Sequence, residues 1–229
     1  MITIEKTDVY GWEAAIRGMR NPLNSWDRSD SVLCKGADGF EDCTVNMTGV
    51  CPRHNDFNHD IFCIGNNDYE LMMRLAKGGS THAKYRRMIT VTADITAPLY
   101  WWKEFDTYKV GTVANSTSTM HKIHAKEFTL DDFSFERTHD GWSWFIESIL
   151  NVLNTAREQF LETNDKSYWE DMIQFLPSSY NQKRTVQLNY EVLAGLYPSR
   201  KNHKLDEWHV LCDWIESLPY SEIITGEEK

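Results

Sequence analysis

The sequence predicts an α/β (α+β) fold, in which strands and helices share one core. Residues 88–97 alternate apolar and polar side chains, which is the period of a half-buried strand. Residues 141–162 and 204–218 instead carry apolar side chains at helical spacing. Because 229 residues suffice for one large domain, we expect a single domain over 1–229, with an irregular insertion at about 30–62.

In the first third of the chain, the pattern predicts a short strand and then a helix within residues 2–20. A second helix is expected to begin at a capping box, with Asn67 as the N-cap and Glu70 at the third helical position. Its buried face would carry Leu71, Met72 and Leu75, and Gly78-Gly79 would end it.

The strand at 88–97 is followed by Pro98, a residue that suits the first position of a helix. That helix would carry Trp101, Trp102 and Phe105. The helix at 141–162 is expected to bury these apolar residues: Trp142, Phe145, Ile146, Ile149, Leu150, Leu153 and Phe160.

Near the C-terminus, Leu176 to Ser179 predicts a turn, and Thr185 to Leu196 predicts a helix that Pro198 closes. The helix at 204–218 would turn its apolar residues inward, and the tail at 226–229 is expected to fray.

The formal charge of −10 disfavours nucleic-acid binding, because the phosphate backbone requires Lys and Arg. The sequence has no run of 18 apolar residues, so it predicts no membrane span. The N-terminus also lacks the basic-then-apolar pattern of a signal peptide. We therefore expect a cytoplasmic protein whose five cysteines are reduced.

Four cysteines and two histidines fall within thirty residues: Cys34, Cys43, Cys51, His54, His59 and Cys63. Only Cys51 and His54 have the short spacing that zinc sites usually show. The pattern fits a structural zinc in a small interaction protein, or thiols with no metal, and we predict no metal site.

The strongest basic patch follows the glycine turn at Gly78-Gly79 and contains His82, Lys84, Arg86 and Arg87. Basic side chains beside such a turn can hold a phosphate. The same residues are equally consistent with a solvated turn before a strand.

A polar run follows the predicted strand and the helix after it, and its members are Lys109, Thr112, Asn115, Thr117, Ser118 and His121. Lysine binds phosphate as a point charge, and hydroxyls complete the shell. The run predicts a ligand site, and the alternative is a loop whose side chains cap the next element. Farther on, Asn189 and Arg200 are eleven residues apart, so an unbroken helix would place them on one face.

From Gly79 to His121 the sequence resembles the flavin-dependent thymidylate synthases. Thr96-Ala97-Pro98 fits the strand end of that family, and ungapped counting places its signature, RHRxxSxNExSxRY, at Thr107 to Met120. Asn189, Leu193 and Arg200 are in step with its C-terminal helix. Thr107-Tyr108-Lys109 stands where the family has Arg-His-Arg, and Glu191 where it has an arginine.

The resemblance implies a mixed sheet with long helices, a homotetramer, and FAD as cofactor. It also implies NADPH and methylenetetrahydrofolate as co-substrates in the methylation of a pyrimidine nucleotide such as dUMP. The residues that it places at the cofactor are His82, Tyr108, Lys109, Asn115 and Asn189. Those that it places at the nucleotide are Lys109, Thr112, Thr117, Ser118 and Arg200, and it names no catalytic residue.

Because the signature is rewritten, the sequence also fits a second function. This is a non-catalytic relative that binds a nucleotide or a flavin in a regulatory or structural role.

Overall fold

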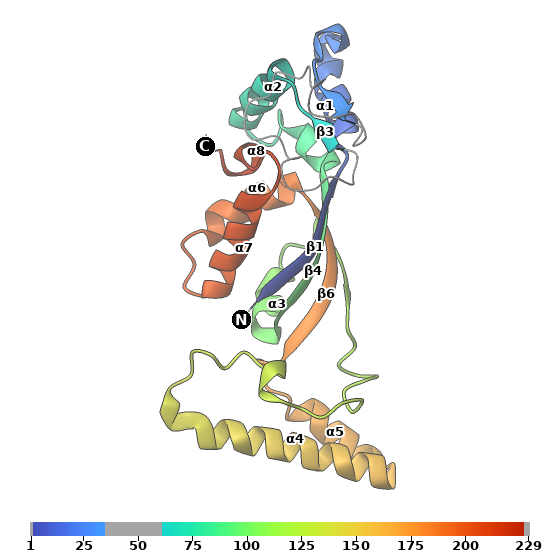
Figure 1. Ribbon diagram of the computed structural model, residues 1–229, viewed down its shortest axis with the longest axis vertical. Coiled ribbons are helices and arrows are strands. Elements are labelled where there is room, and N and C mark those ends of the chain that lie inside the picture. The colour runs from blue at the N-terminus through green and yellow to red at the C-terminus, as the bar shows by residue number, and fades with distance from the viewer. Residues whose placement is uncertain (1, 35–60, 227–229) are drawn as a thin grey trace. The chain divides into compact units, whose positions relative to one another are not determined.

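The structure is a computed structural model that describes residues 2–34 and 61–226 (Figure 1). The predicted insertion at 30–62 therefore lies largely outside the described residues, as do the last three residues of the tail. The α-helices are α1 (Trp12–Arg20), α2 (Asn66–Lys77), α3 (Leu99–Phe105), α4 (Ser143–Thr163), α5 (Lys166–Gln174), α6 (Tyr190–Arg200), α7 (Asp206–Ser217) and α8 (Glu222–Thr225). The strands are β1 (Thr3–Tyr10), β2 (Val32–Cys34), β3 (Ile61–Cys63), β4 (Thr90–Pro98), β5 (Val113–Ser116) and β6 (Asn181–Asn189).

The strands form two sheets. Four of them pair in the order β1-β4-β6-β5, and β2 pairs antiparallel with β3, with Leu33 opposite Phe62. Strand β4 has the predicted alternation, because Ile89, Val91, Ala93, Ile95 and Ala97 are buried while the threonines and Asp94 between them are partly exposed. The mixed helix-and-sheet class that the sequence predicts is confirmed.

The chain forms two compact units, which we call unit 1 and unit 2. Unit 1 comprises Met1–Lys6, Ala93–Lys109 and Val113–Val186. Unit 2 comprises Thr7–Thr92, Val110–Thr112 and Gln187–Lys229.

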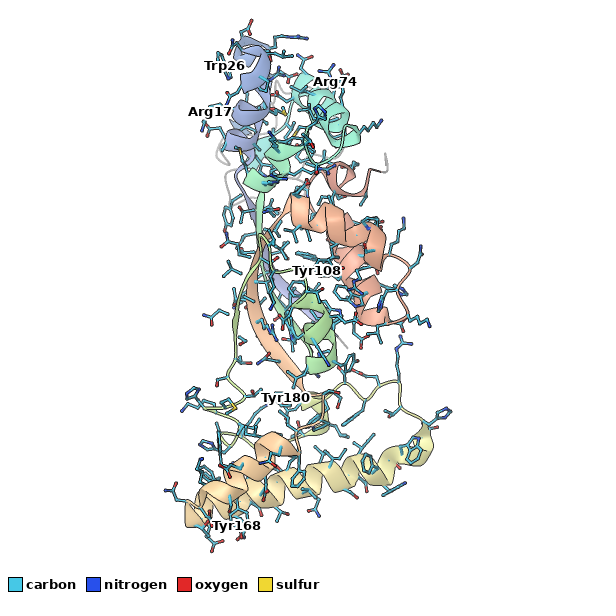
Figure 2. All side chains as sticks on the ribbon, turned by 180° about the vertical axis from the view of Figure 1, so that it is seen from behind. Arg17, Trp26, Arg74, Tyr108, Tyr168 and Tyr180 are labelled. Atoms are coloured by element: carbon cyan, nitrogen blue, oxygen red, sulfur yellow. The ribbon has the colours of Figure 1, made fainter. Side chains whose placement is uncertain are left out.

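In unit 1, α5 packs along the C-terminal half of α4, and no other α-helix that the structure describes in this unit packs against the first half (Figures 1 and 2). Leu153 and Ala156 of α4 are buried in a cluster with Met172 of α5. The predicted buried face is therefore wrong for the start of α4, where Trp142 and Phe145 are about half exposed. The periodicity of the sequence identified an apolar stripe, and only its C-terminal part is covered within the described residues.

Also in unit 1, α3 buries Trp101, Trp102 and Phe105, as predicted. The Trp102 indole Nε1 donates to the carbonyl oxygen of Gln182 at 2.9 Å, and the Arg184 guanidinium lies 4.2 Å from the Trp102 ring centre. Pro98 is the N-cap of α3 rather than its first residue, because its backbone is still extended.

Unit 2 contains the predicted first strand and helix, β1 and α1, although the first residues of β1 belong to unit 1. It also contains α7, whose Trp208, Leu211 and Ile215 are buried as expected. Within the described part of the chain, no helix is long and apolar enough to cross a membrane.

The capping box at Asn67 is wrong, because α2 begins two residues earlier than predicted, with Gly65 as its N-cap and Asn66 as its first residue. The Asp30 carboxylate takes the capping role from a distant part of the chain, accepting the amides of Asn67 at 2.9 Å and Asp68 at 3.2 Å. Met72 is buried as predicted, whereas Leu71 and Leu75 are only partly buried.

The helix predicted at 185–196 is wrong in its first part, because residues 181–189 form β6. Val186 and Leu188 are buried while Thr185 and Gln187 are exposed, which is the two-residue period of a strand. Helix α6 then begins at Tyr190 and continues through Pro198 to Arg200. Asn189 is its N-cap, and its side-chain oxygen accepts the Val192 amide at 3.0 Å.

Candidate phosphate site

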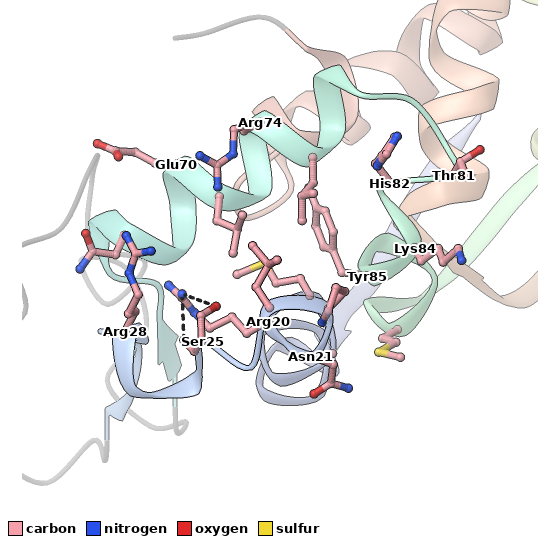
Figure 3. A pocket seen from close by; sticks show the side chains of 18 residues that line it. Arg20, Asn21, Ser25, Arg28, Glu70, Arg74, Thr81, His82, Lys84 and Tyr85 are labelled. Atoms are coloured by element: carbon pink, nitrogen blue, oxygen red, sulfur yellow. Dashed lines mark hydrogen bonds between the residues drawn. The ribbon is translucent and has the colours of Figure 1, made fainter.

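A hollow of about 730 Å³ opens in unit 2 between α1, α2 and three short helical turns (Figure 3). These turns are η1 (Asn21–Leu23), η2 (Trp26–Arg28) and η5 (Lys84–Met88). We call this hollow the cationic pocket. Its volume lies within the range of about 300–1,000 Å³ that is typical of small-molecule sites.

Four basic side chains and one histidine line the cationic pocket: Arg20, Arg28, Arg74, Lys84 and His82. Glu70 is the one acidic residue among the described residues that line it. In Figure 3, Arg74 points toward the hollow and Glu70 points away from it. A positive hollow in a chain with a net charge of −10 favours an anionic ligand there.

The wall between the basic groups is apolar. Met19, Leu71, Leu75 and Met88 line it together with Tyr85. The Tyr85 hydroxyl donates to the carbonyl oxygen of Met72 at 2.8 Å, and burial raises the pKa of Tyr85, so this wall stays neutral. An apolar wall with charged groups around it suits a ring system that carries a phosphate.

Arg20 contributes little free charge to the pocket, because its guanidinium is already paired. Its Nε donates to Asp68 Oδ1 at 2.6 Å, and its Nη1 donates to the Ser25 carbonyl oxygen at 3.2 Å. Both members of the ion pair are almost fully buried. The other basic side chains that line the pocket, apart from His82, are Arg28, Arg74 and Lys84.

The structure places two members of the predicted basic patch, His82 and Lys84, in the cationic pocket. Arg86 is buried and lies 3.6 Å from Glu191 of α6, and Arg87 is exposed outside the pocket. The glycine turn therefore presents two of the four patch residues to this hollow.

The predicted site residues of the polar run are divided between the units. Tyr108, Lys109, Asn115, Thr117 and Ser118 belong to unit 1, whereas Thr112 belongs to unit 2. The Ser118 hydroxyl accepts the amides of Met120 and His121 and lies 2.9 Å from His121 Nδ1. This is the local capping role that the sequence left open as the alternative.

In unit 2, the other two predicted residues, Asn189 and Arg200, lie at the two ends of α6. Asn189 caps its start, and Gly111 lies so close that an added Cβ would be 3.1 Å from Asn189 Nδ2. Arg200 ends the helix, with its guanidinium 4.2 Å from the Trp208 ring centre. Of the predicted cofactor and nucleotide residues, all of which are described, His82 alone lines the cationic pocket.

Sequence reasoning missed Arg28 and Arg74, which are 46 residues apart and lie on opposite walls of the pocket. They are too far apart in sequence to form a recognisable motif, so only the fold shows that both line the same pocket. Glu70 and Arg74 do have the four-residue spacing of a helical ion pair, but that pattern is common on exposed helix faces and does not indicate a site.

The zinc hypothesis falls mostly on residues outside the described ranges, namely Cys43, Cys51, His54 and His59. Cys63 is described, and its side chain is buried. Among the residues in the ranges 2–34 and 61–226, no three His, Cys, Asp or Glu side chains gather to hold a metal ion.

Comparison with known proteins identifies the fold. No protein-family model and no curated protein matches the sequence. Among solved structures, thymidylate synthase X from Helicobacter pylori with FAD and dUMP matches with a TM-score of 0.67 and 14% identity, over 99% of this chain and 98% of that chain. A UMP/dUMP methylase from Streptomyces cacaoi bound with 5-Br dUMP matches with a TM-score of 0.57 and 14% identity, over 99% and 95% of the two chains. The chain therefore has the fold of the flavin-dependent thymidylate synthases, as the resemblance in its sequence implies.

Proposed function

We propose that this chain is a flavin-dependent enzyme that methylates, or otherwise adds one carbon to, a pyrimidine deoxynucleotide such as dUMP. The observation that carries the proposal is the fold match over nearly the full length of both chains, to structures that hold FAD and dUMP. Because a fold alone does not specify a reaction, the chemistry of the cationic pocket is the second support.

FAD carries a diphosphate and two ring systems, and the residues of the cationic pocket fit both. Arg28, Arg74 and Lys84 offer charged donors to phosphate oxygens, and Met19 and Leu75 offer apolar surface to a ring. Once bound, FAD supplies the redox chemistry, with NADPH as reductant and methylenetetrahydrofolate as carbon donor in this proposal. The protein's own residues bind and orient the ligand and exclude water from it.

The residues named by the sequence resemblance remain part of the proposal. The resemblance assigns His82, Tyr108, Lys109, Asn115 and Asn189 to the cofactor, and of these His82 lines the cationic pocket. Lys109, Thr112, Thr117, Ser118 and Arg200 are assigned to the nucleotide. We place the reaction in the cytoplasm.

The test is the visible spectrum of the purified protein, before and after incubation with FAD and gel filtration. Flavin absorbance that co-elutes with the protein, followed by conversion of dUMP to a methylated product with folate and NADPH, is the expected result. A protein that retains no flavin would contradict the enzyme proposal.

A non-catalytic relative is the second candidate function. It is favoured by the side chains at the family signature, where Tyr108 and Lys109 replace His and Arg and Ser118 is engaged by backbone amides. Flavin or nucleotide binding with no product formation at any folate concentration would select this candidate.

The proposal also includes a homotetramer. It is supported by the uncovered start of α4, where Trp144 is 59% exposed and Phe145 is 50% exposed next to the similarly exposed Trp142. Adjacent exposed aromatic residues of this size usually mark an interaction surface.

Replacing both Trp144 and Phe145 by Glu is expected to shift the sedimentation mass from four chains toward one, because each carboxylate would lose its water in the contact. Asn202→Glu, which adds a charge at an exposed position of unit 2, should leave the mass unchanged. A wild-type protein that sediments as one chain at micromolar concentration would rule out the tetramer.

A further inference from the structure

A buried carboxylate organises the wall of the cationic pocket. Asp68, in the first turn of α2, has no exposed surface, and its two oxygens accept five hydrogen bonds. Arg20 Nε donates to Oδ1 at 2.6 Å. Oδ2 accepts the hydroxyls of Ser29 at 2.7 Å and Ser31 at 2.6 Å, and the amides of Asp30 and Ser31, each at 3.2 Å.

These bonds hold a loop between two helices. Arg20 ends α1, and its Nη1 also donates to the Ser25 carbonyl oxygen, so the start of the loop is fixed to the same group as its end. At the far side, the Ser31 hydroxyl accepts the Gly65 amide at 3.0 Å, directly before α2. The loop from Ser25 to Ser31 is thereby attached to both α1 and α2.

Arg28 stands in the middle of this loop, on η2, and reaches toward the start of α2 (Figure 3). The backbone of this residue belongs to the loop that Ser29 and Ser31 attach to Asp68, so the loop carries the Arg28 charge to the pocket wall. The position of Arg28 in the pocket wall therefore depends on the bonds made by Asp68.

We propose that Asp68 is a positioning residue for the cationic pocket, which acts through Ser29 and Ser31 to place Arg28 against the phosphate of the bound ligand. The inference rests on the proposed function, because it takes that pocket as the site of an anionic ligand. Asp68 itself does not touch the ligand.

The geometry also explains why the pocket contains an arginine that is not a binding group. Arg20 forms an ion pair with Asp68 and also donates to Ser25, so its guanidinium stabilises the loop. A positioning role for Asp68 thus accounts for two of the charged residues at the pocket, and leaves Arg28, Arg74 and Lys84 for the ligand.

Ser31→Ala tests the inference while it keeps the ion pair intact. The variant removes the hydroxyl that joins Asp68 to Gly65, so the loop should occupy its binding position for only part of the time. Apparent affinity falls in proportion to that fraction, and we expect FAD and inorganic pyrophosphate to bind about fivefold to tenfold more weakly. Ser217→Ala, which removes a hydroxyl bonded to the Trp214 carbonyl oxygen elsewhere in unit 2, is the matched control.

A double-mutant cycle separates positioning from general loosening. If Ser31 acts through Arg28, the Ser31→Ala change should cost less than twofold in affinity once Arg28→Gln is present. The same full loss in the Arg28→Gln background, or unchanged affinity in Ser31→Ala alone, would overturn the inference and leave the proposed function standing. A wild-type protein that binds neither FAD nor pyrophosphate would overturn both.

Discussion

Asp68→Ala is expected to lower the free energy of unfolding by about 3–5 kcal/mol, the scale measured when one partner of a buried ion pair is removed. The change leaves the Arg20 guanidinium buried without its counter-charge, and it leaves Ser29 and Ser31 without their acceptor. Chemical denaturation followed by circular dichroism measures this loss. Asp27→Ala removes the same charge from an exposed position in the same loop and should change stability by less than about 0.5 kcal/mol.

The effect of Asp68 has a definite dependence on pH. Burial alone would raise the pKa of Asp68, but the hydrogen bonds from Ser29, Ser31 and Arg20, together with the Arg20 charge, bring it below the ordinary value. A carboxylate with a lowered pKa contributes stability above its unfolded-state pKa of about 3.9 and loses that contribution as the pH falls through the folded-state pKa. The difference between wild type and Asp68→Ala should therefore be full at neutral pH and shrink in acid.

A second variant distinguishes the ion pair from the rest of the site. Arg20→Met combined with Asp68→Ala removes both charges, so the double variant should lose less stability than the sum of the two single variants. Simple addition of the two losses would mean that Arg20 and Asp68 are not coupled, contrary to their 2.6 Å contact.

Removing the positive charges of both Arg28 and Arg74 from the cationic pocket should have the largest effect on ligand binding. Arg28→Gln with Arg74→Gln removes two charged donors, each expected to contribute about 1.5–3 kcal/mol to a phosphate contact. FAD affinity should then fall by at least about 100-fold, since about 1.4 kcal/mol is tenfold. Fluorescence quenching of FAD during titration with the protein measures the affinity.

The matched control is Lys77→Gln with Lys204→Gln, which removes two charges from exposed positions outside the pocket. Equal losses in both double variants would mean that long-range charge, and not the pocket, attracts the ligand. Arg200→Ala, at the end of α6, examines the nucleotide instead. We expect it to weaken dUMP binding by about 1–3 kcal/mol while FAD binding is retained.

The elements that the sequence predicted best are those whose pattern depends on one buried face. Strand β4 was predicted at 88–97 and lies at Thr90–Pro98, so its bounds were right to within two residues, because its alternation is strict. The end of β6 was mistaken for a helix, because Val186, Tyr190 and Leu193 also fit a helical spacing. The chain changes from strand to helix at Asn189 without a break, and the capping side chain there was the signal that a strand ended.

The candidate site was predictable only in its local part. His82 and Lys84 follow a glycine turn, so the sequence presents them as a group. Arg28 and Arg74 join them only through the packing of α1, α2 and η5. The same holds for Asp68, which the sequence presents as an ordinary acidic residue in the first turn of a helix.

The distant cap of α2 also bears on the order in which the chain folds. The amides of Asn67 and Asp68 donate hydrogen bonds to Asp30, which is 37 and 38 residues away in sequence. A peptide of residues 66–77 would therefore lack these capping hydrogen bonds. A helix of 12 residues is marginal on its own in water. Helix α5, by contrast, begins at Asp165, whose own side chain accepts the Ser167 amide. The cap of α5 is therefore complete within its own segment, whereas the cap of α2 and the wall of the pocket require contacts between distant segments, which form late in folding.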